Sequence, residues 1–376
     1  MAITLEGTRI TVEFEDGDPK GDSWDDPYTL DDVVTAIANV TKQGNQIYIP
    51  YSLYIEGLDT YFLAEDMQVY FAGEIDDVYS LYVNLANFKS QGNIRGMHWA
   101  DSKTNSRLNF NGTIEVINSV FGYFRTLLFM QGTSIKRSMF IYCTYPYISS
   151  QSGVTLEDVT FLNAQYGILP QNNFSSALRV KIIANTYGVA IGYGGSFNMS
   201  KLILVDNTYD FIAMPEASNR IVNLTDSQID VNSYYVKFTW SGDVTLNLIS
   251  TFKINIENGD GGTAKLYDKD NNLIWTEALL GELEKAVTYY KHYVETDGTL
   301  VADDKTTYEP FKLVISKANY LDLTIPNITI EPGEETHITG KIVKPTYFHQ
   351  EISGKVEVSE VSGKVEISEV SGTIVQ

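Results

Sequence analysis

The amino-acid sequence predicts an all-β protein built mainly from a parallel β-solenoid. Three observations carry this prediction. Short runs of β-branched and aromatic residues recur with a period near 20 residues, and no segment of helical length separates them. The 25 Tyr and 17 Phe residues suit pleated strands. A small β-sandwich and a tail of nine-residue repeats are expected after the solenoid.

The first part of the chain is expected to hold a strand, an acidic arm and a capping helix. The strand is ITLEGTRITVEF (residues 3–14), and the arm is the turn-rich EDGDPKGDSWDDP. Thr29 suits a helix N-cap, and Asp31 and Asp32 follow in the first turn, where acidic side chains complement the helix dipole. The helix is predicted to end near Gly44. Its apolar stripe is Leu30, Val33, Val34, Ile37 and Val40.

The solenoid period is visible in four runs: FIYCTYPYI, FLNAQYGIL, IIANTYGVAI and LVDNTYDFI. Taking Cys143, Asn163, Asn185 and Asn207 as equivalent gives steps of 20, 22 and 22 residues. Such a period without helices describes rungs of two or three strands that stack in parallel. The leucine-rich-repeat signature does not recur, and hairpin turns are too few for a sandwich. The three asparagines are predicted to form a stacked amide ladder.

This tract resembles the right-handed parallel β-helices of pectate-lyase-like proteins and of viral tail spikes. The resemblance covers residues 28–238 and is architectural, because no motif in it is specific to a family. Those families place a capping helix at the N-terminal end of the solenoid, where TLDDVVTAIANV lies here. Such folds carry polysaccharide lyases and glycosidases, so the resemblance also requires a test for catalytic residues.

After Gly242 the period ends and a series of strands is predicted. They are TFKINIEN, GTAKLYDKDNNLIWTEA, PFKLVISKANY, LDLTIPNITI and THITGKIVKP. LYDKDNNLIW should form a hairpin. A short helix is expected from Ala278 to Lys285, with a strand following through Val294. LVISKANYLD followed by IEPGEETHITGKI resembles the small β-sandwich called the carboxypeptidase regulatory-like domain, which implies a spacer or binding module.

The chain finishes in repeats of a nine-residue unit, EISGKVEVS, in which apolar and polar residues alternate. Because nine is odd, a straight strand would turn its apolar face over at every repeat, so one bulge or bend per unit is expected. Several copies wrapped round one axis, with a homotrimer favoured, would bury that face. A flexible tail is the alternative. The predicted assembly residues are Ile352, Val356, Val358, Val361, Val365, Ile367, Val370 and Ile374.

Composition argues against several classes of partner. The net charge of −21 disfavours nucleic acid and anionic lipid, both of which need clustered Lys or Arg. Cys143 is the single cysteine, so an intrachain disulfide framework and a Cys-based zinc site are excluded. No run approaches the ~18 apolar residues of a membrane span. The N-terminal sequence shows no secretory signal, and synthesis in the cytosol is expected.

Candidate catalytic acids are few. Glycoside hydrolysis needs two carboxylates about 5–9.5 Å apart, a separation that residues one or two rungs apart could supply. Asp206 and Asp210 have no acidic residue at the equivalent positions one rung earlier. Glu157 and Asp158 are expected to face opposite sides of a strand. His98 is the only histidine before residue 290 and can equally be a buried residue.

Metal and cofactor sites are not predicted. DKDNN, which starts at Asp268, begins like an EF-hand loop, but leucines stand where glycine and the bidentate Glu are required. A turn is the favoured interpretation. The acidic residues Asp16, Asp18, Asp22, Asp25 and Asp26 could gather Ca²⁺, although a solvated arm is favoured.

Glycan binding by aromatic stacking is the activity that the sequence supports best. Tyr145, Tyr166, Tyr187 and Tyr209 recur near the same point of successive rungs. Aromatic rings bury a large area at low entropic cost and suit binding surfaces. The competing interpretation, which is favoured, is a structural stack that shields a corner of the solenoid.

The functional hypothesis is a virion spike or fibre of a virus of bacteria or archaea, with a role in host attachment or surface decoration. Other virion proteins and a host-surface glycan are its expected partners. A glycan-cleaving tail spike and a cellular surface adhesin or filament subunit, placed extracellularly, are the alternatives. The expected division is an N-terminal arm (1–28), a solenoid (29–240), a β-sandwich (241–345) and a tail (346–376).

Overall fold

The computed structural model describes residues 3–16, 18, 20–71, 80–96, 107–130, 132–148, 153–170, 176–191, 196–213, 219–229, 236–238, 242–297 and 299–345. The chain divides into two compact units. The first comprises the described residues of Met1–Asn223, Ile229–Thr245 and Tyr293–Asp303, and the second those of Leu224–Gln228, Leu246–His292 and Asp304–Gln376. The predicted division at residues 28, 240 and 345 stays a prediction.

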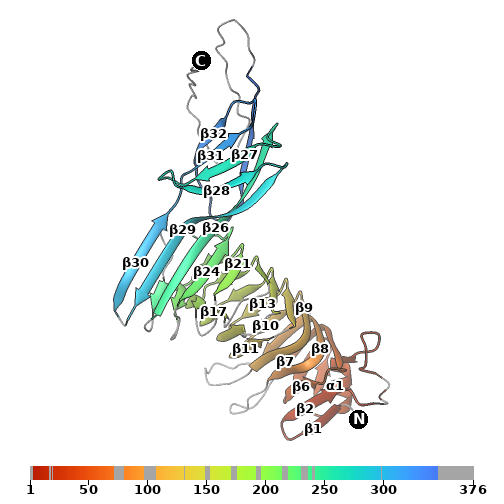
Figure 1. Cartoon of the computed structure of the whole chain (residues 1–376). Helices are drawn as coiled ribbons and strands as arrows, with labels where there is room; N and C mark the ends of the chain where they lie inside the picture. Colours follow the sequence, from red (N-terminus) through yellow and green to blue (C-terminus); the bar gives the residue numbers. More distant parts are fainter. Residues whose placement is uncertain are drawn as a thin grey trace. The chain divides into compact units, whose positions relative to one another are not determined.

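The first unit is a parallel β-solenoid, as predicted (Figure 1). Its strands form three faces, and in each face a strand pairs in parallel with its counterpart on the next rung. The first face contains β2 (Arg9–Glu13), β6 (Ser52–Glu56), β11 (Thr126–Phe129), β14 (Tyr145–Ile148), β17 (Tyr166–Pro170), β20 (Tyr187–Ile191), β23 (Tyr209–Ala213) and β25 (Val236–Phe238).

The second and third faces are built in the same way. The second contains β3 (Tyr28–Thr29), β12 (Thr133–Lys136), β15 (Thr155–Glu157), β18 (Ser176–Leu178), β21 (Phe197–Ser200) and β24 (Arg220–Thr225). The third contains β5 (Gln46–Ile49), β10 (Val120–Gly122), β13 (Met139–Ile141), β16 (Thr160–Leu162), β19 (Lys181–Ile183) and β22 (Ile203–Val205). Three long strands pass from one face to another: β7 (Tyr61–Phe71), β8 (Leu81–Gly96) and β9 (Arg107–Ile117).

Stacked apolar side chains fill the interior of the solenoid. Along the third face, Phe121, Phe140 and Phe161 are each at most 1% exposed, and their rings stack at centroid distances of 5.3 and 5.2 Å. Parallel in-register pairing places identical positions one above another, so like side chains repeat their contacts on each rung. The alternation of buried and half-buried residues in these short strands follows from the period of two.

The helix α1 is shorter than the apolar stripe predicts. It covers Leu30–Ala36, and Asp32 accepts hydrogen bonds from the backbone N and Oγ1 of Thr29 at 2.7 and 2.8 Å, which confirms the predicted N-terminus. Ile37 has extended backbone, and a hairpin follows, formed by β4 (Thr41–Gln43) and β5. Ile37 and Val40 are still buried, so burial rather than helical geometry explains their spacing.

The predicted N-terminal strand is a hairpin. β1 (Ile3–Glu6) and β2 pair antiparallel around a turn that contains Gly7. Gly7 has a φ of 59°, in the left-handed region that glycine adopts without steric cost, and the chain reverses there. β2 then joins the parallel first face by pairing with β6.

The second unit contains further sheets. One is antiparallel, in the order β28 (Leu273–Ala278), β27 (Thr263–Tyr267), β31 (Phe311–Ser316) and β32 (Leu323–Ile328). The other strands at this end of the chain are β26 (Gly242–Glu257), β29 (Leu283–Thr296), β30 (Leu300–Thr307) and β33 (Thr336–Lys341). β26 pairs in parallel with β33, and Phe252 of β26 packs edge-on against Phe311 of the antiparallel sheet at 5.6 Å.

The hairpin prediction for LYDKDNNLIW is confirmed, because β27 and β28 pair antiparallel on either side of it. The prediction of a helix from Ala278 to Lys285 is wrong. The chain turns there at Gly281, which has a φ of 86°, and continues into β29. Pairing between strands overrides the helix propensity of this segment.

Candidate functional site: two corners of the solenoid

Two corners of the solenoid are made by single residues in the left-handed backbone region. The first corner lies between the second and third faces, and the second corner lies between the third and first faces. Left-handed backbone is uncommon for residues other than glycine, so its repetition on successive rungs marks the corner as a fixed structural device. First-corner residues are Asn118, Arg137, Asp158, Arg179 and Lys201. Second-corner residues are Tyr123, Tyr142, Asn163, Ala184 and Asp206.

The amide ladder contains Asn185 and Asn207. Asn185, which is 2% exposed, accepts a hydrogen bond from the Ala164 backbone N through Oδ1 at 2.7 Å. Its Nδ2 donates to the Phe161 carbonyl oxygen and to Asn207 Oδ1, both at 3.2 Å. These bonds join three rungs, because each amide satisfies backbone groups of the rung before it.

Asn163 does not share this position, so the predicted alignment is off by one residue there. Leu162 pairs with Ile183, and Asn163 therefore stands level with Ala184, on the exposed second corner. The residue level with Asn185 is Ala164. A short amide serves well at both places, since asparagine tolerates left-handed backbone and also satisfies buried backbone groups.

The four tyrosines predicted as a stacking surface form a continuous ladder beside the second corner. Adjacent rings of Tyr145, Tyr166, Tyr187 and Tyr209 lie 5.4, 5.0 and 5.5 Å apart between centroids, with interplanar angles of 28°, 29° and 17°. All four are half-buried. Tyr145, Tyr166 and Tyr187 also pack against a buried cluster, which consists of Leu169, Ala190 and Ile212.

This geometry limits what the tyrosine ladder can bind. Each face of Tyr166 and of Tyr187 is covered by a neighbouring tyrosine, and a spacing near 5 Å leaves no room for a sugar ring between them. Ligands could reach only ring edges at these two rungs. The arrangement matches the structural stack better than a row of open platforms.

A second pair of stacked tyrosines, which the sequence reasoning missed, is exposed. Tyr123 and Tyr142 occupy the second corner on adjacent rungs, with φ values of 66° and 56°. Their ring centroids lie 5.1 Å apart, and the two residues are 39% and 49% exposed. The sequence signal is a Tyr one residue before a buried Phe124 or Cys143, at a step of 19 residues.

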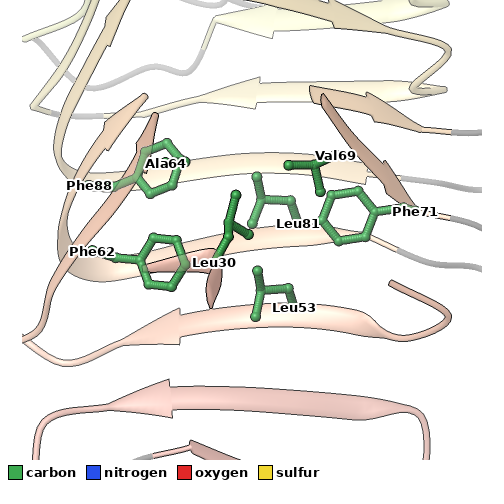
Figure 2. Close-up of a pocket in the computed structure, with 8 residues that line it drawn as sticks. All are labelled: Leu30, Leu53, Phe62, Ala64, Val69, Phe71, Leu81 and Phe88. Carbon is green, nitrogen blue, oxygen red and sulfur yellow. The ribbon is translucent and has the colours of Figure 1, made fainter. Parts of the chain in front are cut away.

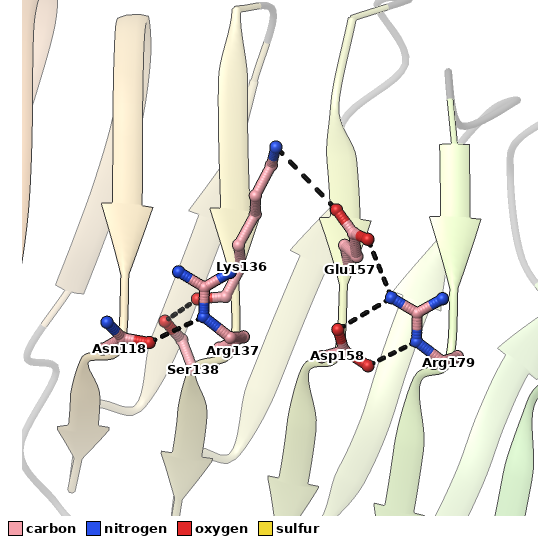
Figure 3. Close-up of polar contacts among 7 residues, drawn as sticks. All are labelled: Asn118, Lys136, Arg137, Ser138, Glu157, Asp158 and Arg179. Carbon is pink, nitrogen blue, oxygen red and sulfur yellow. Dashed lines mark hydrogen bonds and ion pairs between the residues drawn. The ribbon is translucent and has the colours of Figure 1, made fainter.

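At the first corner, the acidic side chains of Glu157 and Asp158 are bound by basic side chains (Figure 3). Arg179 donates from Nε to Asp158 Oδ1 at 2.5 Å, and from Nη2 to Asp158 Oδ2 at 2.8 Å and to Glu157 Oε1 at 2.7 Å. Lys136 lies 3.8 Å from Glu157. The prediction that the two acids face opposite ways is wrong, because Asp158 has left-handed backbone and lies beyond the end of β15.

The hydrogen bonds from Arg179 hold the pKa of Asp158 below its ordinary value. A general acid for glycoside hydrolysis requires the opposite shift, since it must hold a proton near neutral pH. Asp158 therefore suits an ion pair rather than acid catalysis.

Other predicted sites are seen in the structure as follows. Asp268 caps the β27–β28 turn, accepting from the backbone N atoms of Asp270 and Asn272 at 2.9 and 2.8 Å, so the turn interpretation is confirmed. In the acidic arm, Asp18 accepts a hydrogen bond from the Tyr28 hydroxyl. Among the described residues, no group of three or more His, Cys, Asp or Glu is placed to hold a metal ion.

One apolar pocket lies inside the solenoid next to α1 (Figure 2). Its wall has no polar side chain to orient a ligand, so it is a packing gap of the core rather than a binding site. Its lining residues are Leu30, Leu53, Phe62, Ala64, Val69, Phe71, Leu81 and Phe88.

Some predicted residues lie outside the part of the chain that the structure describes. They are His98 and the assembly residues Ile352, Val356, Val358, Val361, Val365, Ile367, Val370 and Ile374. In the described part, no helix has the length and apolar character that crossing a membrane requires.

The fold and the corners define the chain as a β-solenoid protein with a surface built from repeated rungs. Comparison with protein-family models, with curated proteins and with solved structures found no match.

Proposed function

We propose that the chain is a structural component of a virus particle of bacteria or archaea, a spike or fibre that serves in host attachment. The observation that carries the proposal is the regular stack of corners, in which the same backbone conformation recurs on successive rungs from Asn118 to Asp206. Such a stack presents side chains at fixed intervals on a rigid body, which suits display and attachment. The virion assignment itself rests on fold analogy.

The polar side chains of the corners support a structural role over a catalytic one. Arg179 binds Asp158 and Glu157, and the side chain of Asn185 is hydrogen-bonded to the backbone. The nine-residue repeat adds an expected assembly element, because an alternating apolar ribbon gains most when copies bury it together.

Solution mass tests the assembly part of the proposal. Light scattering on the full chain should give three times the 42.1 kDa of one chain, and a chain truncated after Pro345 should give the mass of a monomer. A monomeric full chain would contradict self-assembly through the tail.

Localisation tests the virion part. An antibody raised against the purified chain should label particles released by the producing cells, seen by electron microscopy. Label confined to the cell surface would favour an adhesin or filament instead. Release of reducing sugar from host capsule would favour a glycan-cleaving spike.

A further inference from the structure

We propose that the second corner binds a neutral sugar, with Tyr142 as the stacking platform and Asn163 and Gln165 as hydrogen-bonding partners. This inference deepens the proposed attachment function by naming the ligand class and the site. It differs from binding on the tyrosine ladder, whose inner rings are covered on both faces.

Tyr142 carries two costs at its position. Its backbone is left-handed, a conformation that is a clear outlier for a bulky side chain and that is disfavoured by steric contacts. The residue is also 49% exposed, although aromatic residues stabilise a fold mainly through burial. Asn163 and Asp206 fill the same position on other rungs with residues that suit both conditions.

Within the described part of the chain, Tyr142 has an aromatic neighbour on one face of its ring only. Tyr123 stacks on the ring from the preceding rung at 5.1 Å and supports it. The next rung brings Asn163, whose short side chain cannot cover a phenol ring, and the rung beyond brings Ala184. The ring of Tyr142 is therefore followed along the second corner by a step, the smaller side chains of the next rungs.

The polar side chains on that step suit sugar hydroxyls. Asn163 and Gln165 are exposed, and each amide offers both donors and an acceptor. Thr186 and Thr208 continue the exposed polar row on the following rungs. An aromatic face beside a few amides and hydroxyls combines apolar contact with orienting hydrogen bonds, which is how mixed-polarity ligands are bound.

Charge selects a neutral sugar over an anionic one. The chain carries a net charge of −21, and Asp206 adds an acid to the corner itself. Arg125 is the one cation in the row of described residues that contains Gln165, Thr186 and Thr208. It already has an interaction partner. An anionic polymer would therefore approach against the field of the protein.

The test uses the full chain on an array of neutral hexose and N-acetylhexosamine oligosaccharides beside sialylated and sulfated ones. Neutral glycans should be retained, and the Kd of the best of them should be measured by saturation-transfer NMR. Tyr142→Asn should weaken that binding about tenfold, since a stacked aromatic contributes on that scale. Tyr142→Phe should stay within about threefold of the wild type, because it keeps the ring face.

Arg137→Asn is the matched control. Arg137 is also a left-handed corner residue with an asparagine, Asn118, on the rung before it, and its substitution should leave binding unchanged. Tyr142→Asn places at this corner the residue type that Asn163 already shows there, so folding should be preserved, as circular dichroism would verify.

Three results would overturn the site: no retained neutral glycan, retention of anionic glycans only, or equal weakening by Tyr142→Asn and Arg137→Asn. The inference rests on the attachment proposal, but the failure of one can be distinguished from the failure of the other. If the chain is a trimer on particles but retains no neutral glycan, only the sugar-site proposal is contradicted. If it is a monomer that binds sugar through Tyr142, only the fibre proposal is contradicted.

Discussion

Arg179 holds Asp158, one rung earlier on the same corner, in a two-pronged hydrogen-bonded ion pair at 2.5 and 2.8 Å. Both residues have left-handed backbone with a φ of 55°. Two N–H groups of the planar guanidinium match the two oxygens of a carboxylate, and this bidentate geometry fixes the relative orientation of the two side chains. The pair thus ties adjacent rungs together outside the core.

Asp158→Asn should lower the melting temperature at neutral pH and leave it unchanged in strong acid. The pKa of Asp158 is lowered below its ordinary 3.8 by the hydrogen bonds from Arg179. The folded state therefore binds this proton less tightly than the unfolded state does. The contribution of the pair is present above the ordinary pKa and is lost as the pH falls through the folded-state pKa. Thermal unfolding between about pH 7 and pH 2 measures the difference.

Asp206→Asn is the control for this experiment. Asp206 is an exposed left-handed aspartate on the other corner, for which no ion pair is seen within the described ranges. Its substitution should change the melting temperature little at either pH. The effect of Asp158→Asn should also shrink in about 1 M salt, where the Debye length is near 3 Å. A salt-independent effect would show that the carboxylate acts through something other than the ion pair.

Asn185→Ala should destabilise the solenoid by about 2–4 kcal/mol, because it leaves the buried Ala164 N–H and the Phe161 carbonyl without the amide. Urea unfolding followed by circular dichroism measures the loss. Asn163→Ala, on the exposed corner, should cost about 1 kcal/mol or less. Equal losses for the two variants would contradict the assignment of the ladder to Asn185.

Ala184→Asn should stabilise the protein by up to about 1 kcal/mol. Ala184 is exposed and has a φ of 54°, which an ordinary side chain adopts at a cost, whereas asparagine tolerates it. Ala164→Gly, one rung earlier at the buried position, should instead destabilise the protein, because glycine gives the unfolded chain more backbone freedom to lose on folding. Urea unfolding of both variants checks the two signs, and a destabilising Ala184→Asn would mean that the corner is constrained by more than its backbone.

Cys143 should resist thiol reagents in the folded protein at about pH 8 and react after unfolding in urea. The side chain is 1% exposed, and burial raises the pKa of its thiol to about 12, so almost no thiolate forms. The rate of labelling by iodoacetamide, measured by mass spectrometry, should follow global unfolding. Rapid labelling in native buffer would instead reveal local opening beside the second corner.

The sequence predicts the solenoid because its period resides in apolar residues that pair from rung to rung. Phe140, Phe161, Ile182 and Leu204 begin the four aligned runs, and the structure pairs them in register. Polar residues proved less reliable for register. Asn163 looked equivalent to Asn185 by residue type, yet the two stand one position apart, since an amide satisfies different demands at a corner and in the core.

The exposed aromatic pair and the helix end could not be read from pattern alone. The exposure of Tyr142 depends on a left-handed corner, and the residue at that corner is not one of the glycines or asparagines that usually mark such backbone. The stripe through Ile37 and Val40 reflects burial in non-helical backbone. Likewise, the chain turns at Gly281 where local propensity favours a helix, and β29 then pairs with β30.

The antiparallel hairpin before the solenoid also bears on self-association. Apart from the β4–β5 hairpin, the described strands of the three faces pair in parallel from β2 onward. β1 instead runs antiparallel to β2 and exposes three of its four residues, Thr4, Leu5 and Glu6. A second solenoid that stacked on this edge would meet β1, which runs opposite to the strands of the faces, and the charged side chain of Glu6. We therefore expect the hairpin, which turns at Gly7, to oppose fibrillar growth from this edge.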